Sequence, residues 1–145
     1  MAIWQLSFYA VDKSKKIVDD EIYCWKEKYD KFCNINFLEK KDSWANWIIQ
    51  FGEVDSTCIE ILMDDEISFD VRIRLDIRNL KMKTIKCIID YLCYIDANIL
   101  YDEKIIVPTK ENVIKMILES DAHRFCKSPT GFLDELKVQK NILDK

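Results

Sequence analysis

The segment Ile67-Ser-Phe-Asp-Val-Arg-Ile-Arg-Leu-Asp-Ile-Arg78 decides the fold, because every second side chain in it is large and apolar. Side chains on a strand point alternately to the two faces of a sheet. This period of two therefore predicts a long strand with one face on a core and the other on water or a partner. A straight strand of this length would extend about 40 Å, so we expect a bulge or a sharp twist within it.

Other stretches also have the composition of strands. Residues 57–63 are rich in β-branched and apolar residues and are followed by two aspartates that favour a turn, so they should form an antiparallel hairpin with the long strand. Residues 3–11 alternate in the same way and predict a first strand. Residues 98–101 and 104–107 flank an acidic pair and indicate a second hairpin.

Apolar residues recur at helical spacing in further parts of the chain. Between residues 16 and 33 they recur every three or four positions and predict a helix, and residues 82–95 follow the same pattern. Thr109 is a good N-cap for a third helix, and Ser128 followed by proline repeats this signal for a last one. We interpret residues 34–56 as a loop, a short apolar element and a turn.

The order of these elements predicts an α+β fold. Helices should pack mainly on one face of an antiparallel sheet that has a long central hairpin strand. A chain of 145 residues suffices for one domain, and no linker or internal repeat divides it. We therefore interpret residues 1–145 as a single domain, and we expect the tail over residues 138–145 to fray.

Composition and charge exclude several classes of function. Only two glycines occur, so a glycine-rich phosphate-binding loop is absent. The net charge of −4 argues against nucleic acid as a partner, and no apolar run approaches the roughly 20 residues of a membrane span. With one histidine and no C-x-x-C pair among six cysteines, we predict no metal and no cofactor. The N-terminus lacks a secretory signal, which predicts a cytoplasmic protein with reduced thiols.

The acidic turn before the long strand is one candidate site. Asp64, Asp65 and Glu66 could hold a hard cation such as Mg²⁺, which carboxylates bind. The spacing of an EF-hand and its central glycine are missing, however. We therefore favour a solvated turn.

The polar face of the long strand is a second candidate. Asp70, Arg72 and Arg74 lie on this face, where the arginines could bind a phosphate or an acidic partner. Cross-strand ion pairs with Glu60 explain the arginines equally well. We favour the ion pairs.

Tryptophan, histidine and cysteine give three weaker candidates. Trp44 and Trp47 stand three residues apart, and tryptophan is enriched at interaction hot spots, although we expect core packing instead. His123 could act as a general acid or base, but no recognisable nucleophile accompanies it, so we expect a polar residue on a loop. We interpret the six cysteines as small buried apolar residues rather than as catalytic thiols.

Three motifs follow one another along the chain. They are an Ile3-Trp4-Gln5 strand with Phe8, a central Ser43-Trp44 followed by Gly52, and the strand end Arg74-Leu75-Asp76-Ile77-Arg78-Asn79. With this ordered set the chain resembles small immunity proteins that are encoded beside bacterial polymorphic toxins, including those of contact-dependent growth inhibition systems. The resemblance extends from residue 3 to about residue 136 and concerns the scaffold.

The resemblance implies a cytoplasmic, non-enzymatic protein that binds the toxic domain of a cognate effector and blocks its active site or substrate entry. The negative charge suits a toxin with a basic cleft, because complementary potentials speed association. Two alternatives are a regulatory subunit that docks through residues 44–51 and a small hydrolase that uses His123. The residues that we expect to contact the partner are Asp64, Asp65, Glu66, Asp70, Arg72, Arg74, Trp44 and Trp47.

Overall fold

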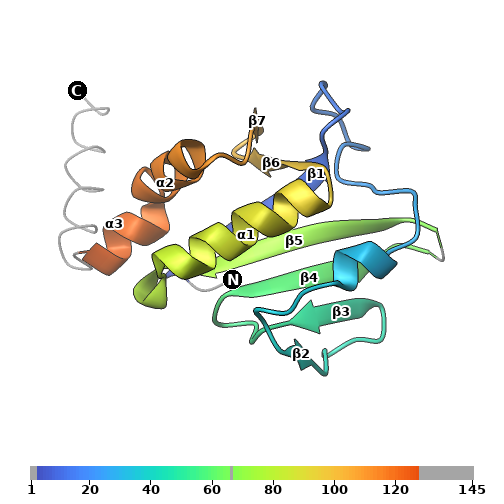
Figure 1. The fold of residues 1–145 in the computed structure, drawn as a ribbon, viewed down its shortest axis with the longest axis horizontal. Coiled ribbons are helices and arrows are strands. Elements are labelled where there is room, and N and C mark those ends of the chain that lie inside the picture. The colour runs from blue at the N-terminus through green and yellow to red at the C-terminus, as the bar shows by residue number, and fades with distance from the viewer. Residues whose placement is uncertain (1–2, 66, 128–145) are drawn as a thin grey trace, which may run out of the picture.

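The computed structural model describes residues 3–65 and 67–127, and these residues confirm the α+β fold (Figure 1). They form one antiparallel sheet with helices against it. The strands are β1 (Gln5–Asp12), β2 (Lys40–Lys41), β3 (Ile48–Phe51), β4 (Cys58–Met63), β5 (Phe69–Asp76), β6 (Ala97–Tyr101) and β7 (Lys104–Ile106). Their order in the sheet is β2-β3-β4-β5-β1-β6-β7, so β2 and β7 are the edge strands.

The helices of the described residues pack on the apolar face of this sheet. They are α1 (Met82–Tyr94), α2 (Lys110–Leu118), α3 (Asp121–Lys127) and the short 3-10 helices η1 (Asp30–Cys33) and η2 (Ile77–Asn79). Figure 1 shows α1 and η1 in front of the sheet, with α2 and α3 towards one side. One core cluster joins α1, α2 and η1 to alternate residues of β1, β4, β5 and β6. This arrangement confirms that helices cover mainly one face.

The long central strand lies where the sequence places it, but it is shorter than predicted. β5 pairs with β4 from Phe69 to Arg74 and with β1 from Val71 to Asp76, and neither ladder contains a bulge. The strand ends at Asp76 because its side chain accepts a hydrogen bond from the backbone N–H of Arg78 and so caps η2. An eight-residue strand needs no bulge to fit the sheet.

The predicted helix over residues 16–33 is wrong. The described chain forms turns there and only the short η1. Ile22 packs in a small cluster with residues of β1 and β6 on one face of the sheet, whereas Trp25 and Phe32 lie in the main core on the other. Trp25 also exchanges two backbone hydrogen bonds with Phe69, of 2.8 and 3.0 Å. A helix offers one apolar stripe to one face, so it cannot serve both clusters.

Residues 34–56 contain the strands β2 and β3, where the sequence predicts only a loop, a short apolar element and a turn, whereas most of the remaining elements agree with the sequence. Both hairpins and the helix over residues 82–95 are confirmed, and Thr109 caps α2 by accepting a hydrogen bond from Asn112 N at 3.1 Å. His123 lies in α3 and not on a loop. The helix predicted after Ser128 and the tail over residues 138–145 lie outside the described residues. None of the helices in the described part of the chain has the length and apolar character that a membrane span needs.

Candidate protein-interaction surface

The loop between β2 and β3 presents two tryptophans to solvent. The side chains of Trp44 and Trp47 are 75% and 46% exposed, so the expectation that they pack in the core is wrong. Their rings meet edge to face, with centroids 5.3 Å apart. The hydroxyl of Ser43 donates to the carbonyls of Ala45 and, at 2.7 Å, Ile48, which holds the loop in shape from within. The rings are therefore presented by an internally bonded loop.

The turn between β4 and β5 lies beside this loop. Met63 N donates to Trp47 O at 2.8 Å, and Ile48 pairs with Leu62 in the ladder of β3 and β4. Ile67 in the turn is 70% exposed. We call Trp44, Trp47 and Ile67 the tryptophan surface. Large exposed apolar side chains gathered on neighbouring loops are typical of a surface that binds another protein.

The aspartates of the turn have different roles. Asp65 Oδ1 accepts hydrogen bonds from the backbone N–H groups of Ile67 at 2.7 Å and Ser68 at 2.8 Å. These bonds, that of Ile67 first, lower the pKa of Asp65, and Lys26 adds a smaller effect. Asp65 therefore builds the turn, as the interpretation of a solvated turn predicts. Glu66 lies outside the described residues.

Asp64 belongs to a small cluster with Asp70 and Cys24. One ligand atom from each of these residues lies within 4.8 Å of the others. Burial, and then the charge of Asp64, raise the pKa of Asp70 to about 6. The spacing would allow a divalent cation to bind, but the clustered carboxylates equally well share a proton, so we assign the cluster no ligand.

The arginines of β5 are engaged within the sheet. Glu60 Oε1 lies 3.1 Å from Arg72 Nη2 and 3.4 Å from Arg74 Nη2, and the carboxylate is only 1% exposed. Arg74 also donates to the carbonyl of Val54 at 3.3 Å. Removing a buried carboxylate from such a pair is costly, so both arginines stabilise the fold. The predicted ion pairs with Glu60 are thus present, and contact of these arginines with a partner stays a prediction.

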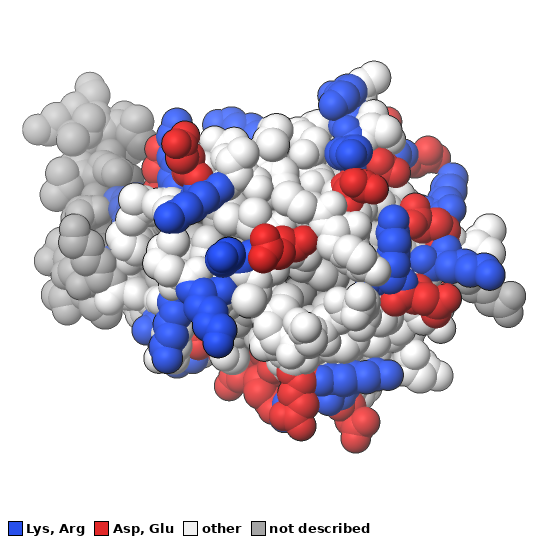
Figure 2. Space-filling view, viewed as in Figure 1, with Lys and Arg blue, Asp and Glu red and all other residues white. Residues whose placement is uncertain are grey.

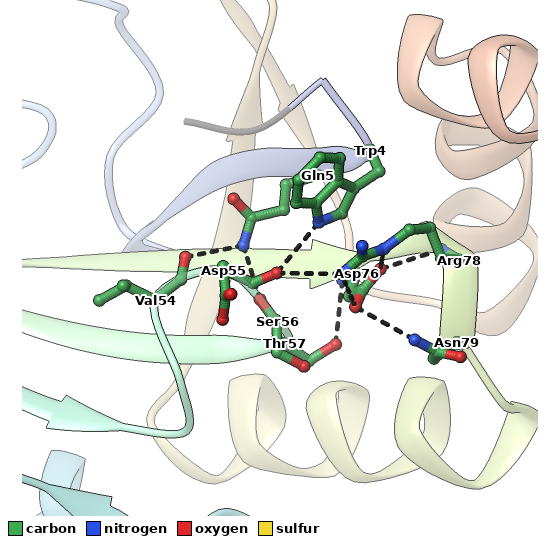
Figure 3. Close-up of polar contacts among 9 residues, drawn as sticks. All are labelled: Trp4, Gln5, Val54, Asp55, Ser56, Thr57, Asp76, Arg78 and Asn79. Carbon is green, nitrogen blue, oxygen red and sulfur yellow. Dashed lines mark hydrogen bonds and ion pairs between the residues drawn. The ribbon is translucent and has the colours of Figure 1, made fainter. Parts of the chain in front are cut away.

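At the opposite end of the sheet, a polar network that the sequence did not reveal surrounds Asp76 (Figure 3). Asp76 is 2% exposed, and its carboxylate accepts hydrogen bonds from Arg78 Nε at 3.0 Å, Arg78 Nη2 at 3.1 Å and Asn79 Nδ2 at 3.4 Å. Burial alone would raise the pKa of Asp76, but the bonds from Arg78 and Asn79 outweigh it and lower the pKa. The carboxylate is therefore held charged as a structural group.

The loop over residues 53–57 is tied to this network. Figure 3 shows Gln5 and Trp4 of the N-terminal segment pointing to the carbonyls of this loop. Gln5 Nε2 donates to Val54 O at 2.9 Å and to Ser56 O at 2.7 Å, and Trp4 Nε1 donates to Asp55 O at 3.0 Å. The guanidinium of Arg78 lies 4.0 Å from the centre of the Trp4 ring, which adds a cation–π contact. The network holds the loop over residues 53–57 in place, and we therefore interpret it as stabilising the fold.

The candidates for catalysis are not assembled into a site within the described residues. His123 is half-buried and lines a small, largely apolar pocket of about 260 Å³ beside Leu80 and Leu118. Burial, followed by the charge of Glu60, raises the pKa of Cys58 to about 11, which keeps this thiol protonated and unreactive. Of the six cysteines, Cys58 is fully buried, four are partly buried and Cys93 is exposed, so the prediction of buried thiols holds fully only for Cys58 and is wrong for Cys93.

Comparison with known proteins adds no relative. No family model, no curated protein and no solved structure matches the chain. The resemblance to immunity proteins therefore stays a prediction, and its support has to come from the geometry of the surface.

Proposed function

We propose that this chain is an immunity protein that binds and neutralises a cognate toxin domain in the cytoplasm of the bacterium that produces it. The tryptophan surface is the observation that carries the proposal. Trp44 is more exposed than any other large apolar side chain of the described residues, and Trp47 lies against it. Tryptophan is prominent among the residues that contribute most to protein binding. Burying this pair in a partner is the simplest use for it.

The proposal also fits the state of the other functional groups. Arg72 and Arg74 pair with Glu60, Asp65 builds a turn, and the Cys58 thiol is protonated. These assignments leave no arrangement of nucleophile, base and charge stabiliser among residues 3–65 and 67–127. An inhibitor that acts by covering a toxin needs none.

The distribution of charged side chains bears on the specificity with which this chain would bind a partner. On the face of the molecule drawn in Figure 2, acidic and basic side chains are interspersed around the margin rather than gathered in a block of one sign. The charge of Lys26 makes a small contribution to the lowered pKa of Asp65, after the hydrogen bonds from Ile67 and Ser68. Such mixed charges favour one matching partner over many basic ones, because a wrong partner would bring like charges together. We expect specificity for one toxin.

A regulatory subunit that docks permanently through the same tryptophans is the second candidate. The two readings differ in what the partner does when this chain is missing. A toxin kills the cell, whereas the partner of a docking subunit loses its own activity or stability. The exposed Trp44 and Trp47 are compatible with an immunity protein and with a docking subunit. The experiment therefore has to measure killing of the cell.

The experiment expresses the C-terminal domain encoded immediately upstream of this chain in a sensitive bacterium, with and without the chain, and counts survivors. We expect rescue and a one-to-one complex on copurification. The double variant Trp44→Ala/Trp47→Ala should weaken the complex by about 100-fold or more, because two hot-spot side chains are lost. Its melting temperature should stay close to that of the parent, since both side chains are exposed.

Tyr94→Ala is the matched control. Tyr94 is a large aromatic residue at the end of α1 and is as exposed as Trp47, but it belongs to a different surface. This variant should rescue the cell as well as the parent does. Killing that the chain does not relieve, or an equal loss of affinity in both variants, would remove the support for the proposal.

A further inference from the structure

We propose that the free edge of β7 receives an extended, basic segment of the toxin domain, which adds to the sheet as an eighth strand. The inference rests on the proposed function, because it assigns this segment to the toxin. It concerns the edge of the sheet opposite to the one that carries the tryptophans, since β2 and β7 are the two ends of the strand order.

The geometry of the hairpin determines which backbone groups face outwards. Asp102 and Glu103 both have positive φ, 51° and 59°, as the two central residues of a type I′ turn do. Tyr101 then forms a hydrogen-bonded pair with Lys104, and the next pair on the ladder is not hydrogen-bonded. The N–H and C=O of Ile105 therefore point away from β6, towards the open edge.

The pairing of β6 with β1 independently indicates that the backbone groups of Ile105 point towards the open edge. Lys13 N donates to Asp96 O at 3.1 Å just beyond the last pair of that ladder. Hydrogen-bonded pairs alternate along an antiparallel ladder, so Leu100 turns its backbone groups towards β1. Its partner on β7 is Ile105, which must then turn its own groups outwards.

The outward groups of β7 have no partner among the described residues. No backbone or side-chain hydrogen bond reaches Ile105 from outside the hairpin. The carbonyl of Val107, in contrast, accepts from Thr109 N at 2.8 Å and from Asn112 Nδ2 at 3.0 Å, which marks the end of the open stretch. Val107 is 56% exposed, and proline appears only after it. Proteins usually protect such edges, so an open one is a candidate for strand addition.

A groove of about 850 Å³ adjoins β7 and provides room for the side chains of an added strand. β7 contributes all of its residues to the lining, α2 contributes Asn112, Lys115 and Met116 on one side, and Glu119 follows directly after this helix. Tyr23, which packs in the small cluster on the other face of the sheet, lines the groove as well. Side chains of an added strand alternate between the two faces, and both faces are available here.

The lining of the groove is acidic on balance. Its carboxylates belong to Asp102, Glu103, Glu119 and Asp121, and its two ammonium groups to Lys104 and Lys115. Asp121 Oδ1 also lies 3.6 Å from Arg124 Nη1, so the charge of this carboxylate is partly neutralised. Burial raises the pKa of Tyr101 in the same groove, and the charges of Asp121 and Asp102 add to this effect. Lysine or arginine on the added strand would complement this charge.

The width of the sheet separates the two contacts. Seven strands about 4.8 Å apart place β7 roughly 29 Å from β2, and thus far from the tryptophan surface. An extended segment of a toxin domain seated on that surface would span this distance. The two contacts should then contribute independently to affinity, because distant sites are additive.

The test measures amide hydrogen exchange by NMR on the full chain, free and in complex with the domain encoded immediately upstream. We expect exchange of the Ile105 amide to slow by at least about tenfold in the complex. The amides of Lys104 and Ile106 point to β6 and are the internal controls, since the hairpin already protects them. Two variants, Ile105→Pro and Ile105→Ala, separate the backbone from the side chain. Both lose the isoleucine, but only proline removes the outward N–H.

The proposal predicts that Ile105→Pro weakens the complex about tenfold more than Ile105→Ala does, with both variants still folded. Replacing the lysines and arginines of the protected toxin segment by glutamine should weaken binding further. A complex that rescues the cell but leaves the Ile105 amide exchanging as in the free chain overturns the strand addition and leaves the proposed function intact. The absence of any complex overturns both. Equal effects of proline and alanine would show that only the side chain matters and would also reject the inference.

Discussion

Asp70 and Asp76 lie on the same face of β5, at opposite ends of the sheet, and their surroundings shift their pKa values in opposite directions. Burial disfavours the charged form of both carboxylates. At Asp76, hydrogen bonds from Arg78 and Asn79 outweigh burial. At Asp70 no described cation compensates, and burial, followed by the charge of the neighbouring Asp64, raises the pKa to about 6.

The difference separates an end of the sheet that stabilises the fold from an end that is available for binding. Around Asp76, side chains and carbonyls from segments about fifty residues apart bond to one another. Around Asp70, the neighbouring loops bond mainly within themselves and direct tryptophans and carboxylates outwards. A chain selected only for stability would pair such groups, so the second end is where we place the contact with a partner.

The largest effect should follow from removing the carboxylate of Asp76. Asp76→Ala leaves Arg78 and Asn79 without their acceptor and releases the loop over residues 53–57, so the free energy of unfolding should fall by about 3 kcal/mol. Urea denaturation at neutral pH measures this. Asp90→Ala on the exposed side of α1 is the control, and it should change stability by less than about 0.5 kcal/mol. If the two variants were equally stable, Asp76 would not be a structural group.

A smaller loss should follow from replacing Gly52, which begins the same loop. Gly52 has φ of +83°, and an added Cβ would overlap the carbonyl oxygen of Thr57 and approach Cys58 Cα to 3.2 Å. Gly52→Ala should therefore cost about 2 kcal/mol. Val54→Ala in the same loop keeps the carbonyl that Gln5 binds and should cost under about 0.5 kcal/mol. A thermal melt that shows no difference between the two variants would contradict the fixed loop.

The sequence predicted those parts of the fold that depend on local pattern. Alternation located β1 and β5, apolar and β-branched composition located β4, and the spacing of apolar residues located α1. The same reasoning failed for residues 16–33, where Ile22 and Trp25 serve clusters on opposite faces of the sheet. Helical spacing says nothing about which face a residue finally packs on.

The sequence predicted only those contacts of the candidate site that follow from the pairing of neighbouring strands. The cross-strand pairing of Arg72 with Glu60 follows from the hairpin, so the sequence indicated it. The bonds from Trp4 and Gln5 to residues 54–56 join distant segments, and no pattern within either segment announces them. The exposure of Trp44 was missed because tryptophan is buried more often than not, and composition cannot distinguish a hot spot from a core residue.

The opposite pKa shifts give the two ends of β5 opposite dependences on pH. Because its pKa is lowered in the folded chain, Asp76 contributes stability above the ordinary aspartate range, and this contribution is lost as the pH falls through the folded pKa. Because its pKa is raised, Asp70 favours the folded state most below about pH 4, and this contribution is lost as the pH rises through about 6. The ionised Asp70 therefore destabilises the fold at neutral pH.

The smallest effect is the gain expected from Asp70→Asn. The neutral amide cannot ionise, so the variant should be more stable than the parent at pH 7.5, by on the order of 1 kcal/mol after allowing for solvent screening at this half-buried position. At pH 3.5, where Asp70 is protonated, the difference should vanish. Urea denaturation across this range measures both values, and Asp12→Asn on β1 serves as the control. A gain that persisted unchanged at pH 3.5 would show that the charge of Asp70 is not its cause, and that the clustered carboxylates are accommodated without cost.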